Sequence, residues 1–292
     1  MLKVPLTRSK ILILLLLILA ILIWTAVFYN PTHLLRATFL DVGQGDSAFL
    51  QFPYGGNMLI DGGVGGRYDK GKKIVAYLRR QGVRRINILL LTHPHEDHGG
   101  GLITVLKSFP VGLVLDSGQV HTSFSYEEFL KLIEEKRIPY RIIRAGEKIK
   151  GFKGVKIFAL SPPPNLLEGT GSDINNNSVV IKIIYEGVSL LFTGDIEREA
   201  EEQLLRYGPY LESTIIKVPH HGSRTSSSPD FLDLVNPRVA VISVGKKNPF
   251  HHPSLQVLQR YKERGVRVYR TDRQGAIIVT SGKGRFRVRT MK

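Results

Sequence analysis

The chain has 292 residues, no cysteine, and a formal net charge of +16 from 41 Lys and Arg against 25 Asp and Glu. The lack of cysteine excludes disulfides and thiolate ligands, so a bound metal would have to be held by His, Asp, Asn or water. The positive charge favours an anionic partner such as nucleic acid, an acidic cell-wall polymer or anionic lipid, although a basic soluble protein has the same balance.

The N-terminal segment is strongly apolar. Residues 11–29 carry no charged side chain, and about 20 apolar residues are enough to span a bilayer. Three basic residues precede this run and favour a cytoplasmic N-terminus: Lys3, Arg8 and Lys10. We therefore expect residues 1–30 to form an uncleaved signal anchor with one transmembrane helix, which leaves residues 31–292 outside the cytoplasmic membrane. A cleaved signal peptide is the alternative.

Strands and helices alternate through the rest of the chain. In the first half we expect strands at 36–42, 47–52, 57–60, 88–91, 111–115, 140–143 and 155–160, and helices at 72–81 and at 125–136 with Ser125 as N-cap. In the second half we expect a hairpin of strands 178–185 and 188–193, a helix at 197–206, a strand at 213–218, a helix opening at Ser228, a strand at 239–244, a helix at 253–264, and strands at 266–270, 276–280 and 286–289. No long polar linker interrupts this alternation, which favours one α/β domain.

The densest polar cluster follows the apolar run 88–91, which is typical of a strand buried on both faces. The loop after this strand carries three histidines and two carboxylates: His93, His95, Glu96, Asp97 and His98. Neutral imidazole and carboxylate are the ligands that borderline divalent metals prefer. His93 and His95 alternate along an extended segment and can face one ion, while Asp97 and His98 lie further on and can face a second.

Histidines also gather at two later positions. Seven of the nine fall in three clusters: His93, His95 and His98; His220 and His221; His251 and His252. Each cluster follows an expected strand or precedes an expected helix. Functional residues of α/β folds gather at strand ends, so these clusters are candidate site residues.

Six motifs in chain order resemble a known family. His93-x-His95-x-Asp97-His98 resembles the signature of the metallo-β-lactamase fold. The other motifs are DVGQGDS at 41–47, NNNS at 175–178, TGD at 193–195, KVPHHGS at 217–223 and RTD at 270–272. From about residue 36 to the end, their order is similar to that of the hydrolase domain of ComEC-type competence proteins. The resemblance implies an αββα sandwich with two pseudo-twofold halves.

The resemblance also implies a site for one or two divalent metal ions, Zn²⁺ or Mn²⁺. It assigns His93 and His95 to the first metal, Asp97 and His98 to the second, Asp195 as the bridge, and His220 as the last ligand, with His221 as the competitor for that role. Catalytic roles are implied for Asp97, Asp195 and His252. A surface histidine that caps a helix is the alternative for His252.

One position departs from the two-metal pattern. Asn177 stands where many members have a third histidine, and an amide oxygen is a weaker ligand than imidazole, so we expect the first metal to be held less tightly. Gln44, Asp46 and Asp61 lie on turns that the fold would bring beside the metals, where carboxylates orient metal-bound imidazoles. The alternative for both aspartates is that they only satisfy turn amides.

Two features are candidates for substrate contact. Ser223 and the amides after His221 can bind an anionic oxygen, or Ser223 can cap a helix. Arg285, Arg287 and Arg289 share one face of an expected strand. Such a row suits a phosphate backbone, but charge also protects a solvated edge strand.

Taken with the resemblance, these patterns predict a membrane-anchored, metal-dependent phosphodiesterase or nuclease that acts on DNA. ComEC proteins carry many membrane spans and this chain has one apolar segment, so a separate DNA-uptake channel is an expected partner. The alternatives are an extracytoplasmic esterase acting on another substrate, such as teichoic-acid phosphorylcholine, and a DNA-binding accessory protein with little turnover. The full ligand set argues against the accessory protein.

Overall fold

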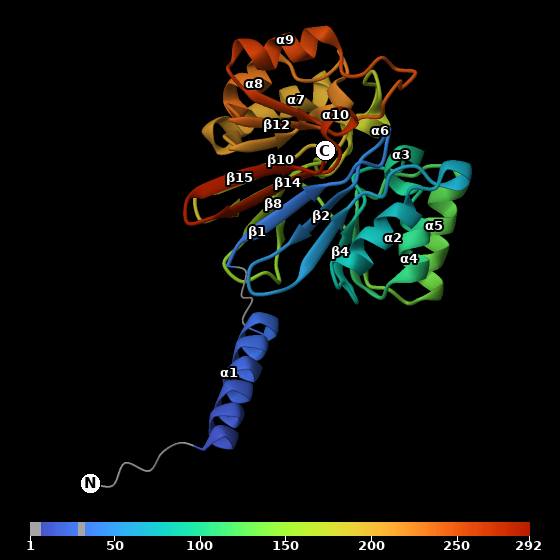
Figure 1. The fold of residues 1–292 in the computed structure, drawn as a ribbon. Helices are drawn as coiled ribbons and strands as arrows, with labels where there is room; N and C mark the ends of the chain where they lie inside the picture. Colours follow the sequence, from blue (N-terminus) through green and yellow to red (C-terminus); the bar gives the residue numbers. More distant parts are fainter. Residues whose placement is uncertain (1–6, 29–32) are drawn as a thin grey trace. The chain divides into compact units, whose positions relative to one another are not determined.

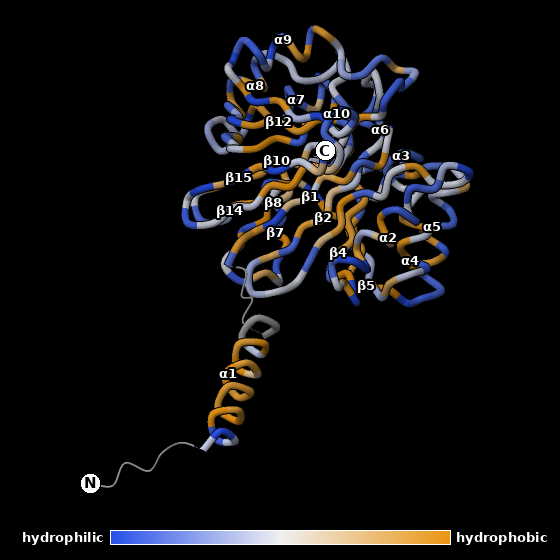
Figure 2. Tube along the Cα trace, viewed as in Figure 1, coloured by the Kyte–Doolittle hydropathy of each residue, from blue (hydrophilic) through white to orange (hydrophobic). Residues whose placement is uncertain are grey.

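The computed structural model describes residues 7–28 and 33–292, and the chain divides into two compact units, Met1–His33 and Leu34–Lys292. The first unit contains helix α1 (Arg8–Phe28), whose residues are largely hydrophobic (Figure 2). Its apolar side chains from Ile11 to Trp24 are exposed. Among the described residues, no helix meets the combined length and hydropathy expected of a membrane span. Lys3 and residues 29–30 of the expected anchor lie outside the described residues, and the transmembrane helix stays a prediction.

Two sheets face each other in the second unit (Figure 1). The first sheet has eight strands in the spatial order β15 (Arg285–Thr290), β14 (Ile277–Gly282), β1 (Leu35–Phe39), β2 (Ala48–Gln51), β3 (Asn57–Ile60), β4 (Ile86–Leu90), β5 (Val111–Asp116) and β6 (Tyr140–Ile142). The second has seven in the order β13 (Arg267–Arg270), β12 (Val239–Ile242), β11 (Ile215–Lys217), β10 (Val188–Phe192), β9 (Val180–Tyr185), β8 (Lys156–Ser161) and β7 (Lys148–Ile149).

Helices cover the outer face of each sheet. The first sheet is covered by α2 (Gly71–Arg80), α4 (Leu102–Ser108) and α5 (Phe124–Glu135), and the second by α7 (Arg198–Leu204), α8 (Pro229–Val235) and α9 (Leu255–Glu263). The short elements are α3 (Glu96–Gly99), α6 (Asp173–Asn176), α10 (Thr271–Gln274), η1 (Gly66–Tyr68), η2 (Leu205–Leu211) and η3 (Pro219–Gly222). This layering confirms the expected αββα sandwich.

Three apolar cores hold the layers together. The core between the sheets includes Phe39 and Phe192, whose rings stack with centroids 5.5 Å apart. One further core lies under the helices of each sheet. Because both faces of each sheet are covered, the central strand β4 is buried on both sides, which explains its apolar run. Burial of each large side chain contributes roughly 1.5–3 kcal/mol.

Helix α5 begins slightly earlier than the sequence predicts. The N-cap is Ser123, whose side chain accepts a hydrogen bond from the amide of Tyr126. Ser125, the expected cap, instead donates to Glu96. Starting the helix at Phe124 places Tyr126 and Phe129 in the core, so burial decides between two serines that are both good capping residues.

Parallel pairing brings the functional loops to one end of the sandwich. Strands β3, β4 and β5 run parallel in the first sheet, and β10, β11 and β12 run parallel in the second. The loops that follow β4, β10 and β11 carry His93, Asp195 and His221. These loops therefore meet at the carboxyl ends of strands from both sheets.

Candidate metal centre

The loop after β4 brings two imidazoles together. His93 Nε2 lies 3.1 Å from His95 Nδ1. The hydroxyl of Thr92 lies 3.1 Å from His93 Nδ1, so this nitrogen is engaged and Nε2 is left for a ligand. His93 is fully buried and His95 half-buried. This geometry suits a shared ion, and the assignment of both residues to a first metal stays a prediction.

His98 is held by a buried carboxylate. Its Nδ1 lies 2.8 Å from Asp61 Oδ2, and Asp61 also accepts hydrogen bonds of 2.8 Å from the amide and the hydroxyl of Thr92. The other ring nitrogen, Nε2, lies 3.2 Å from Asp195 Oδ2. Asp61 therefore orients His98 so that Nε2 points to the centre of the site, which goes beyond satisfying turn amides.

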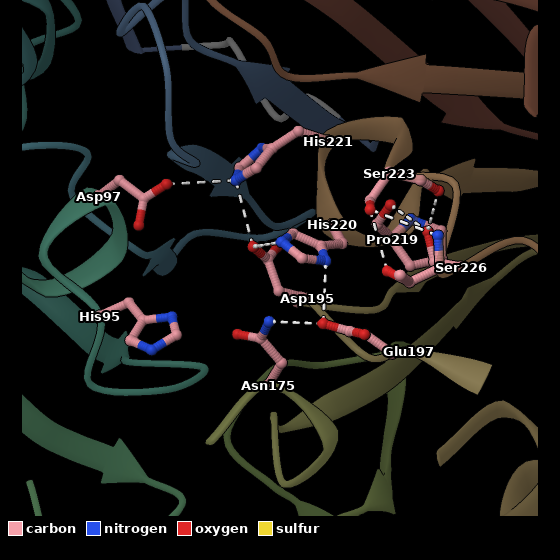
Figure 3. A network of polar contacts seen from close by, with 12 residues as sticks. His95, Asp97, Asn175, Asp195, Glu197, Pro219, His220, His221, Ser223 and Ser226 are labelled. Carbon is pink, nitrogen blue, oxygen red and sulfur yellow. Dashed lines mark hydrogen bonds and ion pairs between the residues drawn. The ribbon is translucent and has the colours of Figure 1, made fainter. Parts of the chain in front are cut away.

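The geometry reverses the expected preference between His220 and His221. His221 is buried, with Nδ1 2.9 Å from the Ser243 carbonyl and Nε2 3.2 Å from Asp195 Oδ2 and 3.4 Å from Asp97 Oδ2 (Figure 3). His220 is partly exposed, and its Nδ1 lies 3.3 Å from Glu197. Both histidines have positive φ, 47° and 53°. In this tight turn the ring of His221 is buried between Asp195 and Asp97, whereas Nε2 of the partly exposed His220 lies 4.0 Å from Asp195 Oδ2 at the edge of the site.

Asn177 does not face the metal centre. Its amide nitrogen donates to the carbonyls of Leu167 and Asp173, and its oxygen accepts from the Leu167 amide. Asn175 lies in the site instead, with Nδ2 2.9 Å from Glu197 Oε1 (Figure 3). The expected asparagine is therefore wrong by two residues, because the short helix α6 turns the first Asn of the motif inward.

A buried lysine lies inside the carboxylate cluster. Lys217 Nζ forms an ion pair with Asp46 and lies 3.4 Å from Asp195 Oδ1 and 2.9 Å from the Gly194 carbonyl. Asp46 Oδ1 also approaches His221 Nδ1 at 3.4 Å. No role for Lys217 was expected from the sequence. Its place at the start of the KVPHHGS motif, at the end of an apolar strand, is the signal that could have found it.

Several buried polar side-chain atoms lack a hydrogen-bond partner. Among the described residues these include His98 Nε2, His221 Nε2 and Asn175 Oδ1. Ligand atoms of His93, His98 and Asp195 lie within 4.8 Å of one another, and so do those of Asp97, His98 and His221. Buried polar atoms without a hydrogen-bond partner are costly, and a shared cation would satisfy these nitrogens and the neighbouring carboxylate oxygens together. The residues therefore fit one or two divalent ions, with nitrogen and oxygen ligands only.

The carboxylates create a strong local preference for positive charge. Burial lowers the pKa of His98 and His221, but the neighbouring carboxylates, Asp195 foremost, outweigh it and raise both values well above the ordinary range. Burial and the nearby His98 lower the pKa of His93 and His95. A divalent ion meets the same preference, with the imidazoles then in their neutral form.

His252 lies at the edge of the centre. Its ring centroid is 5.6 Å from that of His220, and burial together with His220 and His221 lowers its pKa to about 4. Its ring is therefore neutral near pH 7, and its catalytic role stays a prediction. The peptide groups of His252 are held by the Asn248 side chain at 2.8 and 2.9 Å, which fixes the ring beside the site.

The proposed substrate residues lie outside the cluster. Ser223 is buried, and its hydroxyl lies 2.9 Å from that of Thr225, so it stabilises its own loop instead of facing an anion or capping α8. Arg285, Arg287 and Arg289 are exposed on β15, at the edge of the first sheet. Their contact with substrate stays a prediction. Gln44 accepts a 3.3 Å hydrogen bond from the Gly245 amide beside the cluster.

The chain matches known proteins in sequence and in fold. The model of the Metallo-beta-lactamase superfamily matches residues 40–246. The chain is 32% identical over 253 residues to ComE operon protein 3 of Bacillus subtilis (strain 168), covering 82% of this chain and 32% of that protein. It is 31% identical over 263 residues to Competence protein ComA of Neisseria gonorrhoeae, covering 90% of this chain and 34% of that protein. The chain thus spans about a third of the length of these curated relatives.

Among solved structures, Zn²⁺-bound PqqB from Methylobacterium extorquens superposes with a TM-score of 0.56 at 14% identity, covering 85% of this chain and 99% of that chain. At this identity the likeness shows the fold alone.

Proposed function

Because the chain belongs to the metallo-beta-lactamase superfamily, we propose that it is a metal-dependent phosphodiesterase that cleaves DNA. The observation that carries the proposal is the meeting of ligands from both halves of the sandwich at one buried centre. The proposed ligands are His93, His95, Asp97, His98, Asp195 and His221, with Asn175 as an additional oxygen donor to the first metal.

A divalent ion, Zn²⁺ or Mn²⁺, would supply hydroxide near neutral pH and neutralise charge on a phosphoryl oxygen. The residues of the chain provide the rest. Asp97, whose side chain is 28% exposed, is the carboxylate best placed to orient an attacking water. Lys217 engages one oxygen of Asp195 and leaves the other directed at the two imidazoles. Neutral His252 can hydrogen-bond to a substrate oxygen at the edge of the centre.

DNA is favoured as the substrate by two observations. The formal net charge of +16 is suited to a polyanion. The relatives named as competence proteins support a DNA-uptake context, in which a separate channel protein is the proposed partner.

The assay that tests the proposal uses the 292-residue chain in detergent, stripped with chelator and reloaded with Mn²⁺ or Zn²⁺. Single- and double-stranded DNA, bis-p-nitrophenyl phosphate, phosphorylcholine esters and nitrocefin serve as substrates. We expect hydrolysis of DNA and of the small diester only with metal. Full activity in a metal-free sample would refute the mechanism, and turnover of phosphorylcholine esters alone would favour the esterase.

We further propose that α1 anchors the chain in the cytoplasmic membrane with Leu34–Lys292 outside. The support is the apolar run 11–29 with basic residues before it. Alkaline phosphatase fused to the C-terminus should be active in bacteria, because this enzyme folds only outside the cytoplasm. If β-galactosidase at the same position is active instead, the proposed orientation is wrong.

A further inference from the structure

A basic groove lies beside the metal centre. It has a volume of about 780 Å³, and its charged lining consists of five lysines and two aspartates: Lys70, Lys73, Lys246, Lys247, Lys292, Asp41 and Asp272. Asp272 is already paired with Arg270 at 2.7 Å, and Asp41 lies 3.4 Å from Lys292 and 4.0 Å from Lys73. Within the described part of the chain, Lys70, Lys246 and Lys247 form no ion pair, so their charge is free for an anion. We call this site the lysine groove.

One packed contact separates the lysine groove from the metal centre. Gln44 lines the groove, and Asp46, two residues later, forms an ion pair with Lys217 in the centre. Across the groove, Gly245 packs on the same turn so closely that a Cβ there would lie 2.6 Å from Gln44 N. Two residues span at most about 7 Å. The groove therefore begins within two residues of the metal centre along this turn.

The second wall of the groove is also connected to the centre. Lys246 and Lys247 begin the loop that ends at His252, and Asn248 in the groove lining donates to the His252 carbonyl at 2.8 Å. The same side chain donates to the Gly245 carbonyl at 2.9 Å. Asn248 thus fixes the loop that carries both the lysines and His252.

Exposed aromatic rings lie on this surface. Tyr68 lines the groove and is 68% exposed, with the Arg67 guanidinium 6.0 Å from its ring centroid. Phe250 is 61% exposed on the loop that links the groove to His252, and its ring lies nearly parallel to that of His252 at 5.8 Å. Unpaired bases stack on such rings, whereas a polyol phosphate polymer has no flat group to do so.

We propose that the lysine groove binds the phosphate backbone of a single-stranded nucleic acid next to the phosphodiester at the metal centre, with Tyr68 stacking on a base. This inference rests on the proposed function, because it names the part of the substrate that lies beyond the scissile bond. Three unpaired lysines supply the backbone contacts, and the ring favours a single strand over a duplex, whose bases are already stacked on one another.

The test measures binding of a fluorescein-labelled oligothymidylate of 20 nucleotides to the 292-residue chain in detergent. Chelator is present, so that no cleavage occurs. The groove variant carries Lys70→Gln, Lys246→Gln and Lys247→Gln. The matched control carries Lys150→Gln, Lys153→Gln and Lys156→Gln, which removes the same charge from exposed lysines near the opposite end of the sandwich. Affinity is measured by anisotropy across a series of salt concentrations.

We expect the groove variant to bind about tenfold more weakly and to lose roughly two units of salt slope, at about 0.7 per phosphate contact of a single strand. The control should change by less than about twofold. Tyr68→Ala should weaken binding to oligothymidylate but not to an abasic strand of the same length. Equal losses in the groove and control variants would overturn the proposal, because overall charge would then explain the binding.

The outcome also separates this inference from the proposed function. If the groove variant loses affinity selectively while the wild type never cleaves DNA with any metal, the proposed nucleic-acid binding in the groove is supported and the proposed nuclease activity is refuted. If the wild type cleaves DNA and the groove variant binds DNA as tightly as the wild type does, the proposed nuclease activity is supported and the proposed binding in the groove is refuted.

Discussion

Asp195 presents its two carboxylate oxygens to different partners. Oδ2 lies 3.2 Å from both His98 Nε2 and His221 Nε2, whereas Oδ1 faces Lys217 at 3.4 Å. The position that the sequence marks as the bridge thus has one oxygen directed at the ligand nitrogens. A buried lysine on the other side compensates part of the negative charge that burial makes costly.

Replacement of the two adjacent histidines should separate their roles. His221→Ala removes a nitrogen directed at Asp97 and Asp195, so we expect most of the bound metal and nearly all diester hydrolysis to be lost. His220→Ala should keep its metal, because that ring is turned toward Glu197. Metal content by elemental analysis and hydrolysis of bis-p-nitrophenyl phosphate measure this. If only His220→Ala loses its metal, His220 is the last ligand, as the sequence predicted, and His221 is not.

Removal of the buried lysine should destabilise the metal-free chain. Lys217→Met leaves Asp46 and Asp195 buried without their cation, and breaking such a buried pair costs about 3–5 kcal/mol. Lys182→Met is the matched control, since among the described residues this buried lysine on β9 donates to two carbonyls, those of Tyr210 and Glu212, and forms no ion pair.

Urea unfolding with chelator present gives the free energies of unfolding for both lysine variants. A smaller loss of stability in Lys217→Met than in Lys182→Met would contradict the charge argument.

At the scale of elements, the edge strand β15 leads toward the lysine groove. In the pairing of β15 with β14, Arg289 lies opposite Ile278 and Arg285 opposite Gly282. The three arginines therefore extend over about 14 Å of strand, with Arg289 nearest the groove and Arg285 farthest from it. Lys292, which follows the strand, lines the groove. The arginine row is therefore placed to contact only a nucleic acid that extends beyond the groove.

This placement predicts a dependence on strand length. Arg285→Gln, Arg287→Gln and Arg289→Gln together should weaken binding of a 20-residue oligothymidylate several-fold and reduce its salt slope, because phosphate contacts are lost. Binding of a short oligothymidylate that does not extend beyond the groove should change little. Anisotropy titrations at both lengths measure this. An equal loss at both lengths would mean that the strand supports the groove structurally.

At the scale of the whole molecule, the metal centre joins the two halves of the sandwich. His93, His95, Asp97 and His98 come from loops of the first sheet, and Asp195 and His221 from loops of the second. Parts of the chain more than a hundred residues apart therefore contribute proposed ligands to one cluster. A bound ion would stabilise the packing of one sheet on the other in addition to its part in the chemistry.

We therefore expect metal to raise the melting temperature of the chain. A ligand that binds only the folded state adds about 2.7 kcal/mol at a hundred times its dissociation constant. Asp195→Asn is the control: it should keep the fold, lose most activity and show a much smaller rise, because it weakens the bridge. Differential scanning calorimetry with Mn²⁺ or chelator measures this. If the melting temperature of the wild type is the same with Mn²⁺ as with chelator, the proposed metal centre is refuted.

The sequence by itself determined the sandwich and the composition of the site. The apolar run 88–91 and the helical periodicity of 72–81 and 125–136 are local patterns, and they predicted β4, α2 and α5 to within two residues at each end. The histidine cluster after β4 and the motifs in chain order predicted the ligand types, because residue type and short spacing limit which metals can bind.

Only the tertiary structure decided which neighbours in those motifs face the centre. His221 rather than His220, and Asn175 rather than Asn177, depend on two left-handed residues in η3 and on one short helix, whose rotation no local pattern predicts. Lys217 acquired a role only once β11 was placed beside β10, with Asp46 brought in from the first sheet. Adjacent residues point in different directions, so a shift of one or two positions changes a ligand without changing the motif.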